Sequence, residues 1–394
     1  MNILYMGYFC NETVFNRLVE VGSHGSHARQ QLETKLLAGM MSERGGNTLE
    51  MISYLPKIAG VDRTIGEGEN YRGIKIQYVW CNKKNPFSVF KAIGKNIKLI
   101  KKWAKNKQEK VVLTYSTNPI HVIPLYLLRK KCNIKVITLC SEVSAFRRKV
   151  KLNLATCISR KISSMLDNNF DGYILLTPYM NEIVNQKKKP YIVMEGIANE
   201  AKDTKKVEKN RAILYAGGLT EDNGIAILLD GFARLKRNDV ELWICGEGEM
   251  KEQVKKYSRR YGNIRFFGIL PNDQVQEMEK SAMLLISPRF TNNEFTKYSF
   301  PSKTLEYMST GTPTILTRLA GIPSEYFDYV YILENETSEG IQQLLDNILE
   351  QPSEKLNTLG EKAKAFVLKN KSVDVQAKRI LEFMSSFCKN NSVV

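Results

Sequence analysis

Tyr298-Ser-Phe-Pro-Ser-Lys-Thr-Leu-Glu-Tyr-Met-Ser-Thr-Gly-Thr-Pro-Thr-Ile315 contains, in order, the signals of a polar loop, a helix, a tight turn and a strand. Ser302 follows a proline and is a residue type that favours the N-cap of a helix. Leu305 and Met308 supply one apolar helical stripe, and Gly311 predicts the end of the helix. The segment therefore predicts one step of an α/β sheet.

The N-terminus of this expected helix is suited to binding phosphate. The first turn of a helix has free N–H groups and lies at the positive end of the helix dipole. Glu306 follows one turn later, and we expect its side chain to point back towards that end. A carboxylate in this position is suited to accept hydrogen bonds from ribose hydroxyls beside the phosphate.

The same segment resembles the donor-sugar-nucleotide motif of retaining GT-B glycosyltransferases of the family 4 type. In that motif two glutamates eight positions apart flank a loop that contains phenylalanine, and the following helix leads to Gly-Thr-Pro. Glu306 matches the second glutamate, Phe300 the loop aromatic and residues 311–313 the ending, whereas Tyr298 stands where the first glutamate would fall. The loop sequence Ser-Phe-Pro-Ser-Lys is similar to a branch found among bacterial capsule and exopolysaccharide enzymes.

The resemblance implies an α/β GT-B fold, with two Rossmann-like domains facing across a cleft. Residues 1–200 would form the acceptor domain, residues 201–373 the nucleotide-sugar donor domain, and residues 374–394 would return to the first domain. The implied enzyme is a retaining hexosyl- or related transferase that moves a sugar from a nucleotide diphosphate-sugar to a glycan acceptor. Surface polysaccharide biosynthesis and an acceptor linked to polyprenyl diphosphate are the expected context.

Length and composition agree with a globular protein of two domains. The chain has 394 residues, of which 43% are hydrophobic and 25% charged. No run of eighteen apolar residues predicts a membrane-spanning helix, and the first residues enter an apolar strand without the basic start of a signal peptide. The seven cysteines show no paired spacing, which favours a reducing cytoplasm over a disulfide or zinc framework.

The net charge of +17 is concentrated in one half of the chain. Residues 1–200 contain 31 lysines and arginines against 15 aspartates and glutamates, while the remainder is almost balanced. An excess confined to one domain indicates a negatively charged partner. We expect that partner to be a lipid-linked acceptor at an anionic membrane, with the protein in the cytoplasm and peripheral to the inner face of the cell membrane.

Short apolar segments alternate with helical ones in both halves, which predicts parallel sheets covered by helices. In the first half we expect strands at 3–8, 49–54, 74–80, 111–115, 134–139, 173–176 and 191–194, and helices at 28–42, 89–105 and 120–128. In the second half we expect strands at 212–216, 241–245, 264–267, 283–287 and 314–316, and helices at 224–235, 250–261, 274–281, 302–309, 339–350, 354–368 and 374–387. The polar link 198–210 is the expected hinge.

Glycine-rich turns follow the strands of the second half. Gly217 and Gly218 would let the backbone approach a pyrophosphate closely, although a tight strand-to-helix turn explains them equally well. The resemblance places Gly246, Gly248 and Ile269 around the nucleobase. It also implies that the motif residues that contact the donor are Tyr298, Phe300, Pro301, Ser302, Lys303 and Glu306.

Two cations of the family's phosphate site are replaced in this chain. Gly218 and Asn223 stand where the family has arginine and lysine. A diphosphate in a cleft needs other positive charges, so we expect Arg289 with Lys297 or Lys303 to replace the lost pair. The alternative is that all three are solvated surface charges.

Histidines and small residues precede the first long helix. Gly25 and Ser26 match a glycine-rich loop of the family that faces the donor phosphate. His24 and His27 would contact the acceptor or line this loop, or would merely cap the helix. No third histidine or nearby cysteine joins them, so no metal site is expected.

Three further residues follow first-half strands and would lie at the ligand-binding edge of the sheet. Ser116 or Thr117 aligns with a histidine that contacts the sugar in the family, and His121 follows five residues later. His121 would act in catalysis or be a packed structural residue. Glu142 would orient the acceptor or act as a base, or would be a surface glutamate. With Glu306, the residues Ser116, His121 and Glu142 are the expected catalytic group.

Residues 91–110 form a basic stretch with Ile93, Ile97, Ile100 and Trp103 at helical spacing. Such a helix would lie on an anionic membrane with Trp103 at the interface, or would pack its apolar face on the sheet. The basic clusters 129–131, 147–149 and 187–189 add charge to the same half and favour docking to a membrane or another polyanion.

Three other functions fit parts of the sequence. A sugar-nucleotide epimerase shares the two-domain shape but needs more carboxylates in the cleft. A nucleic-acid-binding protein would explain the basic pI of about 9.4, but the basic clusters lack interleaved aromatic residues. A non-catalytic partner subunit would explain the absent arginine, lysine and first glutamate. The chain has no Asp-x-Asp sequence, and we expect no metal or other cofactor besides the donor substrate.

Overall fold

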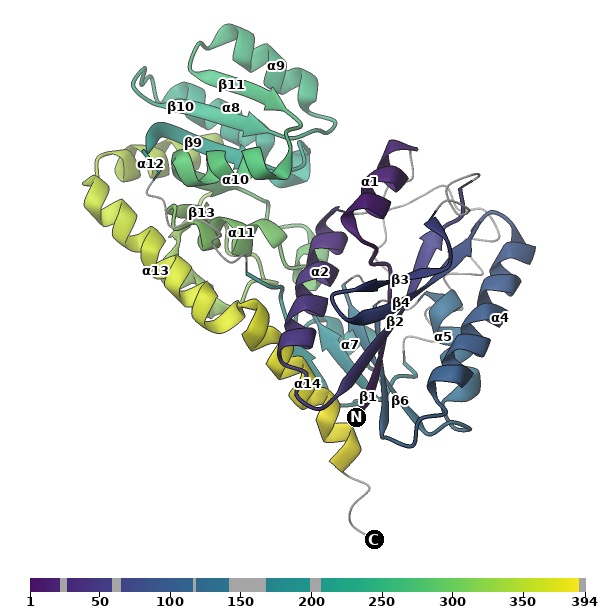
Figure 1. Cartoon of the computed structure of the whole chain (residues 1–394). Coiled ribbons are helices and arrows are strands. Elements are labelled where there is room, and N and C mark those ends of the chain that lie inside the picture. The colour runs from purple at the N-terminus through teal and green to yellow at the C-terminus, as the bar shows by residue number, and fades with distance from the viewer. Residues whose placement is uncertain (22–26, 59–64, 116–117, 142–167, 199–206, 390–394) are drawn as a thin grey trace. The chain divides into compact units, whose positions relative to one another are not determined.

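The computed structural model describes residues 1–21, 27–58, 65–115, 118–141, 168–198 and 207–389 (Figure 1). The chain divides into two compact units. Unit 1 comprises Met1–Ile197 and Val373–Val394, and unit 2 comprises Ala198–Ser372.

Unit 1 is built on a sheet with the strand order β3-β4-β2-β1-β5-β6-β7-β8. All neighbouring strands are parallel except β3, which pairs antiparallel with β4. The central strands are buried on both faces, which explains their continuous apolar sequences. The strands are β1 Asn2–Gly7, β2 Thr48–Pro56, β3 Gly68–Tyr71, β4 Ile74–Cys81, β5 Lys110–Tyr115, β6 Ile134–Cys140, β7 Gly172–Leu175 and β8 Tyr191–Val193.

Two helices of unit 1 begin with the same Asn-Pro signal. The side chain of Asn85 accepts hydrogen bonds from the N–H groups of Phe87 and Ser88 at the start of α4, and Asn118 caps α5 in the same way. Proline at the first helical position loses no helical hydrogen bond. The described helices of this unit are α1 Glu12–Glu20, α2 His27–Ser42, α4 Pro86–Trp103, α5 Pro119–Leu128, α7 Met180–Val184 and α14 Val373–Lys389.

The apolar face of α4 packs on the sheet. This agrees with one of the two alternatives given for the basic stretch 91–110. Ala92, Ile100 and Trp103 are buried, and the Trp103 indole N–H donates a hydrogen bond of 3.0 Å to the Asn2 side chain. Trp103 is only 6% exposed. The expectation that Trp103 lies at a membrane interface is therefore wrong, because the sheet already covers this side chain.

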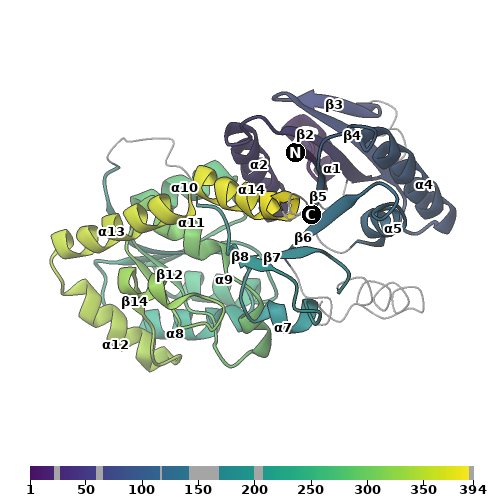
Figure 2. The same ribbon diagram turned by 90° about the horizontal axis from the view of Figure 1, so that it is seen from below.

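The C-terminal helix α14 packs against α2 within unit 1 (Figure 2). Gly39 permits this contact, because a Cβ there would lie 2.7 Å from the Val373 side chain and 2.8 Å from Ala377. Ala377, Ile380 and Met384 have no exposed surface and join the hydrophobic core of the unit. The last helix is thus a part of the first unit's core.

Unit 2 is built on a parallel sheet with the order β11-β10-β9-β12-β13-β14. The order reverses between β9 and β12, and α/β sheets of this type bind ligands beyond the carboxyl ends of the strands at such a point. The strands are β9 Asn210–Ala216, β10 Glu241–Cys245, β11 Ile264–Gly268, β12 Ala282–Ser287, β13 Thr314–Leu316 and β14 Tyr331–Ile332.

The helices of unit 2 follow these strands and close its core. They are α8 Ile225–Arg234, α9 Lys251–Arg260, α10 Asn272–Ser281, α11 Ser302–Thr310, α12 Ser338–Leu349 and α13 Ser353–Lys371, with short 3₁₀ helices at Glu221–Asn223, Glu294–Tyr298 and Ser324–Tyr329. The α/β fold of two units with parallel sheets confirms the predicted fold class.

Candidate functional site

Three loops at the carboxyl ends of neighbouring strands in unit 2 are joined by backbone hydrogen bonds. The Gly217 N–H donates to the Cys245 carbonyl at 3.0 Å, and the Gly246 N–H donates to the Gly268 carbonyl at 2.7 Å. The loops after β9, β10 and β11 therefore form one continuous edge. The predicted donor-binding glycines of unit 2, Gly217, Gly218, Gly246 and Gly248, lie together on this edge.

Close backbone approach explains why Gly246 and Gly248 are glycines. A Cβ on Gly246 would overlap with the carbonyl oxygen of Gly217, and one on Gly248 would overlap with that of Leu219. Gly246 also has a φ of +139°, which other residues rarely adopt. These glycines hold the β9 and β10 loops in contact.

The glycine loop after β9 is held from two sides. The Tyr215 hydroxyl and the Asn223 side-chain amide each donate a 2.7 Å hydrogen bond to the Gly218 carbonyl. Asn223, which stands where the family has lysine, thus supports the loop rather than supplying charge. Two N–H groups of this loop are used within the fold, since Gly217 donates to the Cys245 carbonyl and Leu219 to the Glu247 carbonyl.

Arg289 lies next to this loop, just beyond the end of β12. The Phe290 N–H donates to the Asp222 carbonyl at 3.3 Å, which joins the segment after β12 to the segment after β9. Burial lowers the pKa of the Arg289 guanidinium, and the neighbouring Tyr215 and Asp222 oppose this effect. Within the part of the chain that the structure describes, the Arg289 Nε has no hydrogen-bond partner. A half-buried cation at the reversal point can bind an anion.

Helix α11 carries the motif, and its N-cap differs from the one that the sequence predicts. Pro301 is the N-cap, and Ser302 is the first helical residue without a capping hydrogen bond. The prediction of Ser302 as the N-cap is therefore wrong by one residue, because the proline already ends the extended loop. Tyr307 anchors α11 to the sheet, since its hydroxyl accepts from the Ala216 N–H at 2.8 Å.

Glu306 belongs to a cluster of three charges. The Lys303 ammonium lies 2.9 Å from the Glu306 carboxylate and 3.2 Å from that of Glu279 on α10. Glu279 is fully buried, which raises its pKa to about 7 against the opposing attraction of Lys303. The two carboxylates raise the pKa of Lys303, although its own burial acts in the opposite direction. Lys303 is thus neutralised inside the unit, which makes Arg289 the better candidate cation for a diphosphate.

The loop residues before α11 have different environments. Phe300 is buried and packs against Tyr326 with a ring-centre distance of 5.5 Å, so it contributes to the core. Lys297 is exposed, while Tyr298 is half-buried at the end of a 3₁₀ helix where the sequence predicts an irregular loop. Ile269, at the end of β11, is 73% exposed and is available to contact a planar base.

His121 of unit 1 is enclosed by aromatic rings. Tyr8 lies 5.4 Å and Tyr54 6.2 Å from the imidazole, measured between ring centres. His121 has no exposed surface, and burial lowers its pKa to about 3, with a smaller contribution from Lys83. The sequence allowed His121 to act in catalysis or to be a packed structural residue. A neutral, enclosed imidazole agrees with the packed structural residue. A contact with sugar would require these rings to move.

The remaining first-half predictions lie outside the described residues. These are His24, Gly25, Ser26, Ser116 and Glu142. His27 is the first residue of α2, and its side chain is not described.

A buried carboxylate that the sequence did not indicate lies at the carboxyl end of β1. Glu33 of α2 accepts hydrogen bonds from the Tyr5 hydroxyl at 2.8 Å and from the Tyr8 N–H at 2.9 Å. Burial raises the pKa of Glu33 to about 7. Gly7 leaves room for this carboxylate, since a Cβ there would overlap with it. Glu33 therefore positions Tyr8 at the edge of the sheet.

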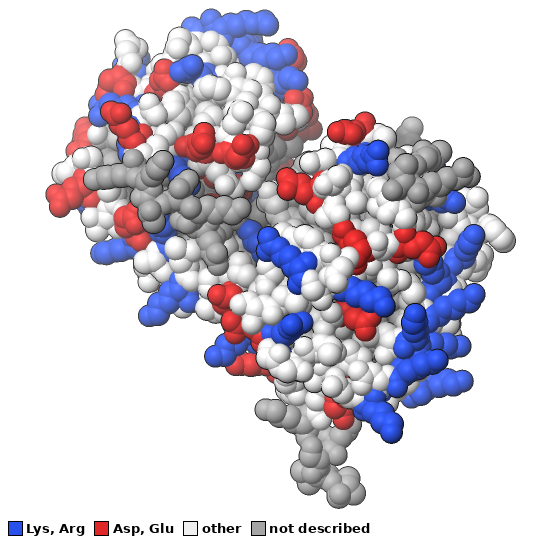
Figure 3. All heavy atoms as spheres, viewed as in Figure 1, with Lys and Arg blue, Asp and Glu red and all other residues white. Residues whose placement is uncertain are grey.

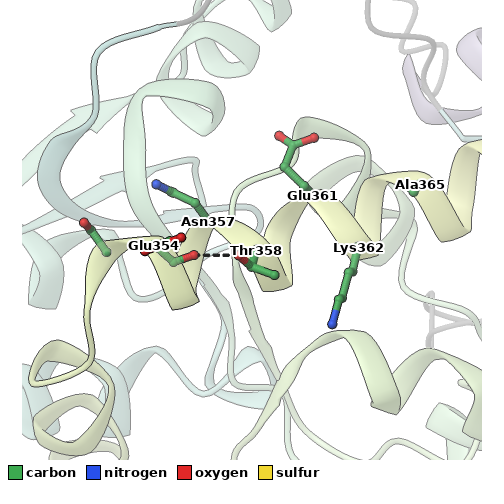
Figure 4. Close-up of a pocket in the computed structure, with 7 residues that line it drawn as sticks. Glu354, Asn357, Thr358, Glu361, Lys362 and Ala365 are labelled. Carbon is green, nitrogen blue, oxygen red and sulfur yellow. Dashed lines mark hydrogen bonds between the residues drawn. The ribbon is translucent and has the colours of Figure 1, made fainter.

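Other features of the described residues add no second site. Among them, no group of three His, Cys, Asp or Glu residues is arranged to hold a metal ion. None of their helices is long and apolar enough to cross a membrane. An open groove follows the side of α13 between Ser353 and Ala365, and the motif residues do not line it (Figure 4).

Comparisons with known proteins agree with this geometry. Residues 197–366 match the model of the family described as glycosyl transferases group 1, and this match covers the strands and glycine loops of unit 2. No curated protein sequence matches the chain. Unit 2 therefore contains a domain that matches this family, and the match and the fold described above together support a glycosyltransferase.

Solved structures share the fold over the whole chain. A sucrose-phosphate synthase from Thermosynechococcus elongatus has a TM-score of 0.67 at 13% identity and covers 99% of this chain and 100% of its own. A glycosyltransferase from Rickettsia africae has a TM-score of 0.64 at 17% identity and covers 99% of both chains. Anabaena HepE, solved in complex with UDP-glucose, has a TM-score of 0.64 at 13% identity and covers 98% of this chain and 100% of its own. The shared architecture is the GT-B fold.

Proposed function

We propose that this glycosyltransferase binds a nucleotide diphosphate-sugar at the carboxyl edge of the unit 2 sheet and transfers the sugar to a glycan acceptor. The arrangement that carries the proposal has two parts at the point where the strand order reverses. Helix α11, which carries Glu306, is hydrogen-bonded through Tyr307 to Ala216 just before the glycine loop. Arg289 lies beside the same loop. The complex of Anabaena HepE with UDP-glucose supports this class of donor.

Each group in this arrangement has a chemical role. The Gly218 N–H of the glycine loop and the Arg289 guanidinium would bind the diphosphate and stabilise the charge that develops on it as it leaves. The Glu306 carboxylate would accept hydrogen bonds from the ribose hydroxyls. Gly248, with Ile269 on the next loop, would border the base, and Tyr298 would face the sugar where the family has glutamate. No metal is required if Arg289 and the backbone supply enough positive charge.

Isothermal calorimetry with a panel of UDP- and GDP-sugars tests the donor site. The wild-type enzyme should bind one member of the panel, and Glu306→Gln should weaken that binding by about 10- to 100-fold. Arg289→Ala should weaken it by a similar factor, with partial recovery in Arg289→Lys. Unchanged affinity in Arg289→Ala would remove Arg289 from the site. No binding of any donor would favour a non-catalytic partner subunit.

The finer assignments are a retaining mechanism, a lipid-linked acceptor and a place in capsule or exopolysaccharide synthesis. They rest on the motif branch and on the basic first half of the chain. Turnover with a polyprenyl diphosphate-linked glycan, followed by NMR of the new anomeric centre, tests the first two. The same assay in EDTA tests whether a metal is needed, and incubation with donor alone tests for epimerase activity.

A further inference from the structure

One helix of unit 1, α4, is rich in lysine and is flanked by further lysines. Residues 82–108, which include α4, contain nine lysines and no aspartate or glutamate. In Figure 3 the Lys and Arg side chains gather over α4 at the right-hand edge of the view. A surface with this excess of positive charge attracts an extended anionic partner.

The outward side of α4 also carries two large apolar side chains. Phe87 is 78% and Phe90 72% exposed, in the first turns of the helix. The positions 87, 90, 91, 98 and 101 recur at helical spacing and are all exposed. We call this set, Phe87, Phe90, Lys91, Lys98 and Lys101, the α4 face.

The α4 face is separate from the contacts that hold α4 in the fold. Its opposite side is the buried row formed by Ala92, Asn96, Ile100 and Trp103. Gly94 lies within the outward row, and a Cβ there would have no neighbour within 4 Å. Lys95, at the side, forms an ion pair of 3.3 Å with Glu67 and is not counted in the face. Folding of unit 1 therefore makes no use of Phe87 and Phe90.

We infer that the α4 face docks on an anionic lipid bilayer. Exposed phenylalanines gain free energy when they enter the apolar boundary of a bilayer, and adjacent lysines gain it from anionic headgroups. A nucleic-acid duplex would use the lysines alone and leaves the two exposed phenylalanines unexplained. A single strand, whose unpaired bases can stack on phenylalanine, is an outcome that the experiment below tests. The combination of charge and apolar side chains thus favours the membrane.

The docking also adds to the proposed function, because the α4 face would be the surface at which the enzyme meets a lipid-linked acceptor. Only this statement about the acceptor rests on the proposed function. The binding itself is measurable without donor, acceptor or turnover. If no nucleotide sugar binds, the docking result is therefore unaffected. If the protein does not bind vesicles, the result of the donor panel is likewise unaffected.

Vesicle co-sedimentation of the full chain tests the inference with neutral phosphatidylcholine vesicles and with vesicles that contain phosphatidylglycerol. We expect binding to the anionic vesicles only. Lys91→Gln/Lys98→Gln/Lys101→Gln should reduce it by a factor on the order of 100 at low salt. Phe87→Ser/Phe90→Ser should reduce it by about tenfold or more at every salt concentration.

A matched control removes three exposed lysines from unit 2. Lys256→Gln/Lys355→Gln/Lys369→Gln loses the same charge and should bind vesicles as the wild type does. Equal losses in both triple variants would show a general charge effect and overturn the assignment to α4. Wild-type binding by the phenylalanine variant would also overturn it, as would tight binding to a short single-stranded RNA without vesicle binding. Circular dichroism of each variant checks that the fold is intact.

Discussion

The Lys303 ammonium lies 2.9 Å from the Glu306 carboxylate, one helical turn further along α11. The same ammonium lies 3.2 Å from Glu279 on α10. Lys303 therefore ties the motif helix to a neighbouring helix and restricts the direction of the Glu306 side chain. A carboxylate that must meet two ribose hydroxyls benefits from such restriction, because little conformational freedom remains to be lost on binding.

The first prediction concerns removal of this ammonium. Lys303→Met leaves Glu279 buried beside Glu306 without a counter-ion, so we expect a loss of about 2–4 kcal/mol in the free energy of unfolding. Donor affinity should also fall, because Glu306 is released. Denaturant unfolding and calorimetry measure the two effects, and Lys303→Arg should retain much of both. A stable Lys303→Met protein with wild-type donor affinity would contradict the proposed role of the ion pair.

The second prediction concerns pH and Glu279. Its pKa is raised from 4.5 to about 7 by burial, so between these values the folded state holds a proton that the unfolded state has lost. The stability of the folded state must therefore fall as the pH rises from about 4.5 to 7, by up to about 3 kcal/mol. Glu279→Gln should abolish this contribution. The difference in unfolding free energy between wild type and variant, measured from pH 4.5 to 8, should change only within that window.

The third prediction concerns Gly246. Alanine at this position would force a Cβ onto the Gly217 carbonyl and would require a φ that alanine rarely adopts. We expect Gly246→Ala to separate the β9 and β10 loops, with a loss of donor binding and a stability cost of about 1–3 kcal/mol. Gly262→Ala is the control, since a Cβ there meets nothing within 4 Å. Equal behaviour of the two variants would show that the loop contact is unimportant.

The fourth prediction separates the two roles considered for His121. Its pKa is lowered from 6.5 to about 3, mainly by burial, so below pH 6.5 the unfolded state binds a proton that the folded state refuses. Stability is therefore lost as the pH falls from 6.5 towards 3. His121→Leu should remove this acid-side loss. If His121 is only a packed residue, the variant should also keep its transferase activity at pH 7.5, whereas a catalytic imidazole would make the variant inactive.

The fold was predictable where the buried strands show continuous apolar runs between turn signals. The bounds of β10 and β13, Glu241–Cys245 and Thr314–Leu316, agree with the sequence prediction residue for residue. The prediction missed α1, β3, α7 and β14, the longest of which has nine residues. β3 has the sequence Gly-Glu-Asn-Tyr and pairs only with β4, so no apolar alternation marks it.

The candidate site was predictable only in part. The motif located α11 and Glu306, and the glycines marked the turns. Nothing in the sequence distinguishes Glu279 from a surface glutamate, because it lies in a polar helix with the sequence Asn-Asp-Gln-Val-Gln-Glu-Met-Glu-Lys-Ser. Tyr215, Tyr307 and Glu33 are equally ordinary in sequence, and their roles come from partners 3 to 91 positions away.

The sequence by itself determined the alternation of strands and helices, the motif helix and the uneven distribution of charge, because these properties depend on neighbouring residues. Only the tertiary structure decided which charges are buried, which lysine is neutralised and which aromatic side chains stay in water. Those outcomes depend on desolvation and on contacts between distant segments. Trp103 and Phe87 illustrate the difference: both lie on the same helix, but the sheet covers the first and leaves the second exposed.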